Sequence, residues 1–132
     1  MTLREVMHAH IPWLTLESTV RDAVDKMDIY QFPALVAVDP SMRPMAVVTE
    51  GDLCRNAFQR DSLIEMSNEP AYRLGTQDPT CVDPEMEIGA AFHMMLSSGL
   101  TVLPIVMDNR LIGIALRVDL MQAMLMDASI RA

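Results

Sequence analysis

The sequence predicts an α/β fold built from two copies of one unit, in the order strand, amphipathic helix, strand, strand, helix (βαββα). The first observation is an internal repeat, because residues 13–58 and 81–125 carry the same pattern, in which Ala23 of the first copy recurs as Ala91 of the second. The second is that each copy has two apolar runs of strand length after its first helix. Units of this kind bury their apolar faces against each other. We therefore expect two repeats related by a pseudo-two-fold axis and packed through their sheets.

The elements of the first copy are predicted from the spacing of apolar residues and from capping, proline and turn residues between them. Ser18 or Thr19 can cap a helix whose apolar residues follow the i, i+3, i+4, i+7 rule, and Pro33 ends that helix. A turn at 39–41 joins two apolar runs, which predicts an antiparallel hairpin. The expected elements are an extended lead-in over 1–12, a strand over 13–15, a helix over 19–30, strands over 35–38 and 45–48, and a helix over 49–59.

The second copy repeats this order after a join over 61–80, in which residues 63–66 can form a helical turn. Gly99 is the expected residue just beyond the end of its first helix. We place the domain boundary after residue 66, so that residues 1–66 hold the first repeat with its lead-in and 67–132 the second. The expected elements are a strand over 81–82, a helix over 85–97, strands over 103–107 and 111–116, and a helix over 118–126.

Composition restricts the function classes. The chain has 132 residues, 51% of them hydrophobic, and a formal net charge of −8. This acidic balance argues against nonspecific binding to nucleic acid or to an anionic membrane surface. No apolar run approaches the roughly 20 residues that span a bilayer, and the first ten residues do not look like a signal peptide. The two cysteines form no disulfide framework, so we expect reduced thiols and a cytoplasmic protein.

A strand runs into a helix N-terminus at the end of each hairpin, and an acid follows within one turn. The first junction is Val47-Val48-Thr49-Glu50-Gly51-Asp52, and the second is Ile114-Ala115-Leu116-Arg117-Val118-Asp119. Free main-chain N–H groups and the positive end of the helix dipole suit anions and hydroxyls at such a junction. A carboxylate there can accept both hydroxyls of a vicinal diol such as ribose. Thr49 and Asp52 also have the spacing of a capping box, which needs no ligand.

These junctions resemble the motif G-h-h-[ST]-x-x-D (h, apolar) of the cystathionine-β-synthase (CBS) domain, which occurs in tandem pairs called Bateman modules. Thr49 and Asp52 match its polar positions, and Asp119 matches in the second copy, where Leu116 replaces the hydroxyl residue. The run 103–106 approximates the family's Leu-Pro-Val-Val strand, and 5–7 its D-V-M opening. The resemblance covers essentially the whole chain. It implies a βαββα fold for each half, with two symmetry-related clefts that bind AMP, ADP, ATP or S-adenosylmethionine.

The resemblance also assigns residues to these clefts. Ribose hydroxyls go to the aspartate, phosphates lie near the Ser/Thr position and nearby basic residues, and the adenine lies against apolar residues of the other repeat. In the second cleft, Arg117, Arg4 or His8 could replace the hydroxyl that Leu116 lacks. The first cleft would comprise Val47, Thr49, Asp52, Thr80, Leu100, Thr101 and Val102. The second would comprise Pro12, Phe32, Pro33, Ala34, Ala115, Leu116, Arg117 and Asp119.

Other chemistries find less support in the sequence. His8, His10 and His93 do not have the spacing of a metal site, and the thirteen methionines are typical of core and interface packing rather than of Cu(I) ligation. Cys54 is interpreted as a buried small hydrophobe rather than a redox thiol. The chain has no Walker A loop, no GxGxxG and no Ser-His-Asp order.

We therefore expect a stand-alone regulatory module rather than an enzyme. It would bind an adenosine-containing ligand and signal through an effector protein whose identity the sequence does not give. The alternative is a ligand-free dimerisation module, which the leucine at 116 favours. A nucleotide hydrolase would need a metal-carboxylate cluster or a general base, and the sequence indicates neither. The resemblance also implies a homodimer, for which the helix over 118–126 and the helix that carries Phe92, Met95 and Leu96 are the candidate surfaces.

Overall fold

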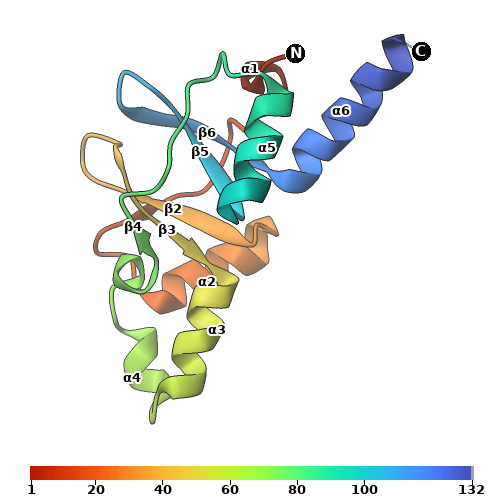
Figure 1. Cartoon of the computed structure of the whole chain (residues 1–132). Helices are drawn as coiled ribbons and strands as arrows, with labels where there is room; N and C mark the ends of the chain where they lie inside the picture. The colour runs from red at the N-terminus through yellow and green to blue at the C-terminus, as the bar shows by residue number, and fades with distance from the viewer. Residues whose placement is uncertain (132) are drawn as a thin grey trace. The chain divides into compact units, whose positions relative to one another are not determined.

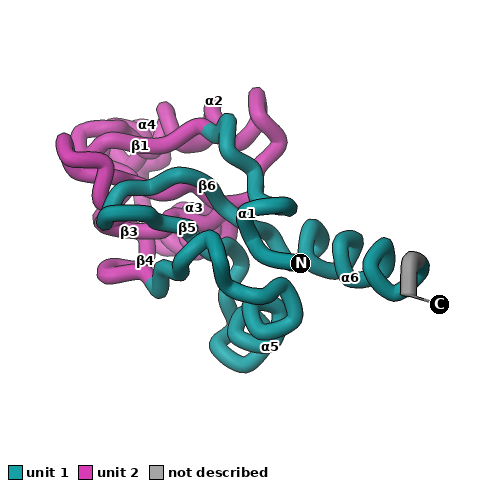
Figure 2. Tube along the Cα trace, turned by 90° about the horizontal axis from the view of Figure 1, so that it is seen from above, with its two compact units in different colours: residues 1–11, 80–132 teal, residues 12–79 magenta. Residues whose placement is uncertain are grey.

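The computed structural model describes residues 1–131, with side chains to residue 129 (Figure 1). It divides into two compact units, which are coloured separately in Figure 2. One unit comprises residues 12–79, and the other joins residues 1–11 to residues 80–132. The predicted mixed α/β fold with two repeats is confirmed. Among the described residues, no helix combines the length and the apolar character needed to cross a bilayer.

The unit of residues 12–79 is a four-stranded sheet with its helices on one face. The sheet order is β1-β2-β3-β4, in which β1 is parallel to β2 and the other neighbours are antiparallel. The predicted hairpin of the first copy is confirmed, and its register pairs Val36 with Val47. The elements are β1 (Leu14–Thr15), α2 (Val20–Tyr30), β2 (Ala34–Val38), β3 (Pro44–Thr49), α3 (Glu50–Gln59), α4 (Leu63–Ser67), the 3₁₀ helix η1 (Ala71–Leu74) and β4 (Thr76–Gln77).

The core of this unit lies between the sheet and its helices. Alternate residues of β2 and β3 point to the same face, as the period of two requires. They meet Val20 and Ala23 of α2 and Leu53 of α3 in one buried cluster. The sheet contributes Leu14, Leu35, Ala37, Ala46 and Val48, while Met66 and Ala71 close the cluster from the join. The helical turn expected at 63–66 is thus the short helix α4, which is anchored by a buried methionine.

The other unit is built around the second hairpin, whose strands β5 and β6 form a two-stranded antiparallel sheet. Its elements are α1 (Leu3–Val6), α5 (Ile88–Ser98), β5 (Val102–Met107), β6 (Arg110–Leu116) and α6 (Arg117–Arg131). Gly99 ends α5 in the left-handed conformation at φ 63°, as predicted. The fully buried Leu3 joins Met95, Leu103 and Leu120 in the core of this unit.

Several element boundaries differ from the sequence predictions. The strand expected at 81–82 is reduced to a single bridge from Val82 to Ile105. Helix α5 begins at Ile88 rather than 85, after a bend stabilised by the hydrogen bond that Met86 N–H donates to the Asp83 carbonyl. The join contains η1 and β4, which the sequence analysis did not predict.

The lead-in is not wholly extended, because residues 3–6 form the helical turn α1. Glu5 accepts the main-chain N–H of Thr2 at 3.1 Å, which closes a capping box. The lead-in also packs with residues 80–132 and not with the first repeat, since Leu3 is buried in that core. The two compact units therefore meet along the chain near residues 11 and 79, whereas our sequence boundary lies after residue 66.

The beginnings of the two repeats occupy equivalent places on opposite sheets. His8 forms an antiparallel bridge with Ile114 of β6, and Thr76 pairs with Val47 of β3. Thr76 is the counterpart of His8 in the second copy, because the two are separated by the same number of residues as Ala23 and Ala91. Val47 and Ile114 are themselves equivalent, because each precedes the last residue of its strand by the same interval. Each repeat thus lends its opening segment to the sheet of the other repeat.

Candidate functional site

Each unit carries one of the two strand–helix junctions predicted to bind ligand. We call Val47, Thr49 and Asp52 the first half-site, and Ala115, Leu116, Arg117 and Asp119, together with His8, the second half-site. In both, the strand ends at the residue that precedes the first helical turn, as the sequence pattern predicts. The aspartate therefore stands at the third helical position, where the helix dipole favours negative charge.

At the first half-site, Thr49 and Asp52 hold each other in a capping box. The Thr49 N–H donates to Asp52 Oδ2 at 2.9 Å, and the Asp52 N–H donates to Thr49 Oγ1 at 3.0 Å. Arg55 then donates to Asp52 Oδ1 at 2.5 Å from one turn further along α3. The Asp52 side chain is 13% exposed, and that of Arg55 is 70% exposed. An ion pair with so exposed a partner is weak, so Arg55 can move aside at little cost.

The same box occurs where no ligand site is predicted. In α2, the Thr19 N–H donates to Asp22 Oδ2 at 2.9 Å and the Asp22 N–H donates to Thr19 Oγ1 at 3.2 Å. These main-chain and hydroxyl hydrogen bonds lower the pKa of Asp22, most strongly the main-chain one. Helix capping alone therefore accounts for the box at Asp52, and the box by itself does not indicate a ligand site. The two aspartates differ in their setting, because Asp22 lies outside the junction between the apolar hairpin and its helix.

The second half-site has the same carboxylate but a different partner. Leu116 N–H donates to Asp119 Oδ2 at 3.0 Å, as Thr49 N–H does to Asp52. Leu116 provides no hydroxyl, so the reciprocal side-chain bond of the box is missing. In its place, His8 Nε2 lies 2.8 Å from the same oxygen of Asp119. Of the three groups that could compensate for Leu116, His8 therefore contacts the aspartate, whereas Arg4 pairs with Glu85 at 2.6 Å.

The apolar segments assigned to the clefts lie beside the junctions of their own units. The Glu50 N–H donates to the Pro33 carbonyl at 2.9 Å, and Ala34 pairs with Thr49, which places residues 32–34 next to the start of α3. In the other unit, Val102 pairs with Leu116, which places residues 100–102 beside the start of α6. Thr80 and Arg117 are exposed and Pro12 is half-buried. The assignment of these segments to the opposite cleft stays a prediction.

Phe32 and Pro33 also line a cavity of about 470 Å³ on the helical side of their unit. The cavity lies between α2 and α3, and neither Thr49 nor Asp52 lines it. Cys54 lines it too and is exposed, which shows that its interpretation as a buried residue was wrong. The physical reason is its position next to the buried Leu53, one residue further around the helix and away from the core.

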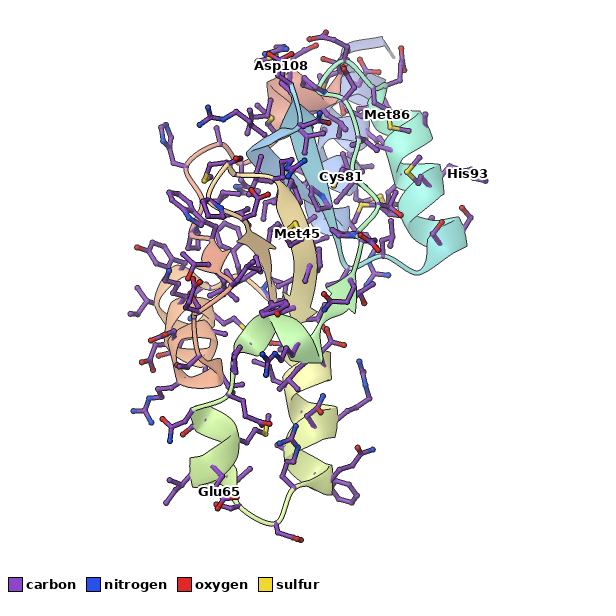
Figure 3. All side chains as sticks on the ribbon, turned by 90° about the vertical axis from the view of Figure 1, so that its left-hand side faces the viewer. Met45, Glu65, Cys81, Met86, His93 and Asp108 are labelled. Carbon is purple, nitrogen blue, oxygen red and sulfur yellow. The ribbon has the colours of Figure 1, made fainter. Side chains whose placement is uncertain are left out.

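Met95 and His93 lie on different sides of α5, which bears on the expected dimer surface and on metal binding. Met95 is fully buried, so it belongs to the core and not to an outer face of α5. His93 lies on the outer side of the same helix (Figure 3). Within the described part of the chain, no group of three or more His, Cys, Asp or Glu side chains is placed to hold a metal ion.

Arg55 is a site residue that the sequence analysis missed. Its signal was present, because an arginine three residues after an acid on a helix lies within ion-pair reach. The contact of His8 with Asp119 spans 111 residues and has no comparable local signal.

Comparison with known proteins identifies the repeat. The family model described as the CBS domain matches residues 3–58 and 71–126. Two solved structures have closely similar folds. CBSX2 in complex with AMP is 23% identical with a TM-score of 0.83, covering 96% of this chain and 98% of that one. The CBS-domain containing protein ATU1752 from Agrobacterium tumefaciens is 13% identical with a TM-score of 0.84, covering 94% and 99%.

Among curated proteins, an uncharacterized 17.7 kDa protein of Acidianus ambivalens is 31% identical over 108 residues, which is 81% of this chain and 63% of that protein. Inosine-5'-monophosphate dehydrogenase of Methanocaldococcus jannaschii is 27% identical over 119 residues, which is 89% of this chain and 22% of the enzyme. The chain thus spans less than two thirds of the length of these curated relatives.

Proposed function

Because this chain belongs to the CBS-domain family and contains two copies of the domain, we propose that it is a regulatory module for an adenosine-containing ligand. The ligand class is AMP, ADP, ATP or S-adenosylmethionine. The observation that carries this proposal is Asp52, a carboxylate fixed at the strand–helix junction with an easily displaced arginine as its outer partner. The AMP bound to a neighbour of similar fold supports the same class.

At the first half-site, each group has a role in this proposal. The Asp52 carboxylate accepts the two ribose hydroxyls as the Arg55 side chain moves off. Thr49 and the N-terminus of α3 face the anionic part of the ligand, since main-chain N–H groups at a helix start stabilise negative charge. Arg55 can then pair with a phosphate instead of with Asp52. The adenine wall that the sequence analysis assigns to the other repeat stays part of the prediction.

Regulation would follow from differential affinity. A ligand shifts the module between two states only by the difference in its binding free energy for each state. A micromolar ligand binds with about 8 kcal/mol at standard state, so even a modest fraction of that energy can change the balance between states. The effector protein would read that change through contact with the module, and the module itself would catalyse no reaction.

A ligand-free dimerisation module is the second candidate. The leucine at position 116 favours it, because the second half-site lacks the hydroxyl of the family motif. We propose a homodimer for either candidate, formed through apolar residues on the outer faces of the helices. On α6 these exposed residues are Val118, Met121, Leu125 and Met126, and on α5 the exposed residue is Leu96. Light scattering on the wild type and on Leu125→Glu tests this, since a dimer should become a monomer in the variant.

A thermal melt against AMP, ADP, ATP, S-adenosylmethionine and a guanosine control tests the ligand class. A ligand at about 100 times its dissociation constant adds roughly 2.7 kcal/mol to the free energy of unfolding. In a chain of this size, that raises the midpoint by several degrees. A shift selective for an adenosine compound supports the proposal and names the ligand. No shift with any of them contradicts it and favours the dimerisation module.

A further inference from the structure

At the second half-site, a histidine side chain contacts the aspartate that the family motif assigns to the ligand. His8 Nε2 lies 2.8 Å from Asp119 Oδ2, and that same oxygen accepts the Leu116 N–H at 3.0 Å. We propose that His8 is a specificity-determining residue, which occupies the position on Asp119 that a ligand hydroxyl needs and so directs the first ligand to the Asp52 half-site. This inference rests on the proposed function, because it concerns the order in which the two half-sites fill.

The competition follows from the number of hydrogen bonds that a carboxylate accepts. Each of its oxygens has about two lone-pair positions. A vicinal diol that binds in a bidentate manner donates one hydroxyl to each oxygen. At Asp119, the Leu116 N–H and the His8 ring nitrogen already use both positions of Oδ2. A diol can therefore bind there in full only after the imidazole moves away.

The main chain of His8 is hydrogen-bonded to β6, apart from the contact that its side chain makes with Asp119. Its N–H donates to the Ile114 carbonyl at 2.9 Å, and the Ile114 N–H donates to the His8 carbonyl at 3.0 Å. The neighbouring strand approaches so closely that a Cβ on Gly113 would lie 2.7 Å from the His8 carbonyl oxygen. The fully buried Leu3 anchors the same lead-in five residues earlier. Truncation of the His8 side chain would thus leave the bridge and the lead-in intact.

The partner of Asp52 is much easier to displace. Arg55 reaches Asp52 from an exposed position on the same helix, and its side chain is 70% exposed. The His8 side chain is 40% exposed, and the main chain of His8 is held on β6 by two hydrogen bonds. An exposed pair three residues apart on a helix contributes little to stability. The ligand therefore meets less competition at Asp52 than at Asp119.

The equivalent position in the first half-site carries a smaller residue. Thr76 pairs with Val47 as His8 pairs with Ile114, and the repeat makes Thr76 the counterpart of His8. The exchange of threonine for histidine therefore distinguishes two half-sites that are otherwise built on the same register. The repeat explains why one side chain can alter a single half-site without changing the fold.

The test isolates the second half-site with Asp52→Ala. Isothermal titration calorimetry with AMP compares this variant with the double variant Asp52→Ala/His8→Ala. We expect the removal of His8 to increase the affinity for AMP by about 10-fold or more, the size of effect given by the loss of one competing charge-assisted hydrogen bond. Addition of Asp119→Ala should abolish that gain. His10→Ala, at an exposed neighbouring histidine, is the matched control and should leave the affinity unchanged.

The possible outcomes separate this inference from the proposed function. Wild-type protein that binds AMP, together with a double variant no tighter than Asp52→Ala, contradicts the role of His8 alone. Wild-type protein that binds AMP at two sites of equal affinity also contradicts the role of His8. Wild-type protein that binds none of the adenosine ligands contradicts the proposed function and this inference with it. Thermal melts of each variant confirm that the compared proteins are folded.

Discussion

The carbonyl oxygen of Val47 approaches Gly75 so closely that a Cβ on that glycine would lie 2.3 Å from it. The same Cβ would lie 2.9 Å from the Val48 side chain, so β3 or the segment of Gly75 would have to shift to admit it. This approach lets the opening segment of the second repeat pair with β3 of the first. Gly75 is therefore needed for its lack of a side chain, since its φ of −93° is open to any residue.

Gly75→Ala should destabilise the protein, because the main chain of β3 or of the join must move to admit the methyl group. We expect a loss of about 1–3 kcal/mol in the free energy of unfolding, the usual cost of overpacking. Urea denaturation measures it. Gly89→Ala is the matched control, since its Cβ would meet nothing within 4 Å and alanine favours the helix. A Gly75→Ala variant as stable as Gly89→Ala would show that the β3–β4 contact does not constrain the fold.

Thr49→Ala should remove one of the two capping bonds of α3. The Asp52 N–H would lose its 3.0 Å acceptor. We expect a loss of about 1 kcal/mol in the free energy of unfolding. Thr49→Ser keeps the hydroxyl and should retain most of the stability, and denaturation of both variants measures the difference. Equal stability of alanine and serine at this position would contradict the assignment of Thr49 as a helix cap.

The stability of the fold should decline in acid in part through Asp22 and Asp39. Main-chain hydrogen bonds from Thr19 and Arg43, respectively, are the main cause of the lowered pKa values of these carboxyls. A carboxyl whose folded pKa lies below its unfolded value stabilises the fold above the unfolded value, and this stabilisation is lost as the pH falls through the folded pKa. The unfolded reference here is 3.8, so the loss belongs to the range around and below that pH.

Replacement of both carboxyls by Asn should therefore reduce the dependence of unfolding on pH in this range. Denaturation at a series of pH values between about 2 and 5 measures the slope for the wild type and for Asp22→Asn/Asp39→Asn. The wild type should lose more stability than the variant as the pH falls. Parallel curves would show that these two carboxyls do not contribute to acid sensitivity.

The two thiols should react at different rates with a disulfide reagent. Cys54 is exposed on α3, while burial raises the pKa of the Cys81 thiol and so lowers its thiolate fraction at neutral pH. Mass spectrometry after brief labelling should find Cys54 modified first. Cys54→Ser should remove the fast phase, and Cys81→Ser should leave it. Faster labelling of Cys81 would contradict the environments described for the two residues.

Local patterns account for most of the fold that the sequence predicted. The helix over 19–30 was visible because Thr19 and the apolar spacing lie within one short window, and the hairpins were visible from their continuous apolar runs. Helix α1 was not visible, because so short a segment forms a helix only when Leu3 is buried by a core from the distant second half of the sequence. Tertiary burial of this kind leaves no periodic signal.

The residues of the candidate site likewise fall into those that a local sequence pattern predicts and those that depend on contacts between distant segments. Thr49 and Asp52 could be found because the motif and its capping box are contiguous, and Asp119 because the repeat carries it over. The contact between His8 and Asp119 depends on a bridge between the lead-in and β6, so sequence spacing could only suggest His8 among three candidates. Cys54 was interpreted as buried from its residue type, because free cysteines are usually buried, and that prior does not say which face of α3 the residue occupies.

The most direct test of the account compares two aspartates that cap helices in the same way. Asp52 and Asp22 accept the same main-chain contact in their boxes, and only Asp52 stands at a proposed ligand site. Calorimetric titration of AMP into the wild type, Asp22→Ala and Asp52→Ala separates capping from binding, because both variants lose an equivalent cap. We predict unchanged affinity for Asp22→Ala and a loss of about 10-fold or more at the tighter site for Asp52→Ala. Equal affinities in the two variants would contradict the central claim that Asp52 holds the ligand.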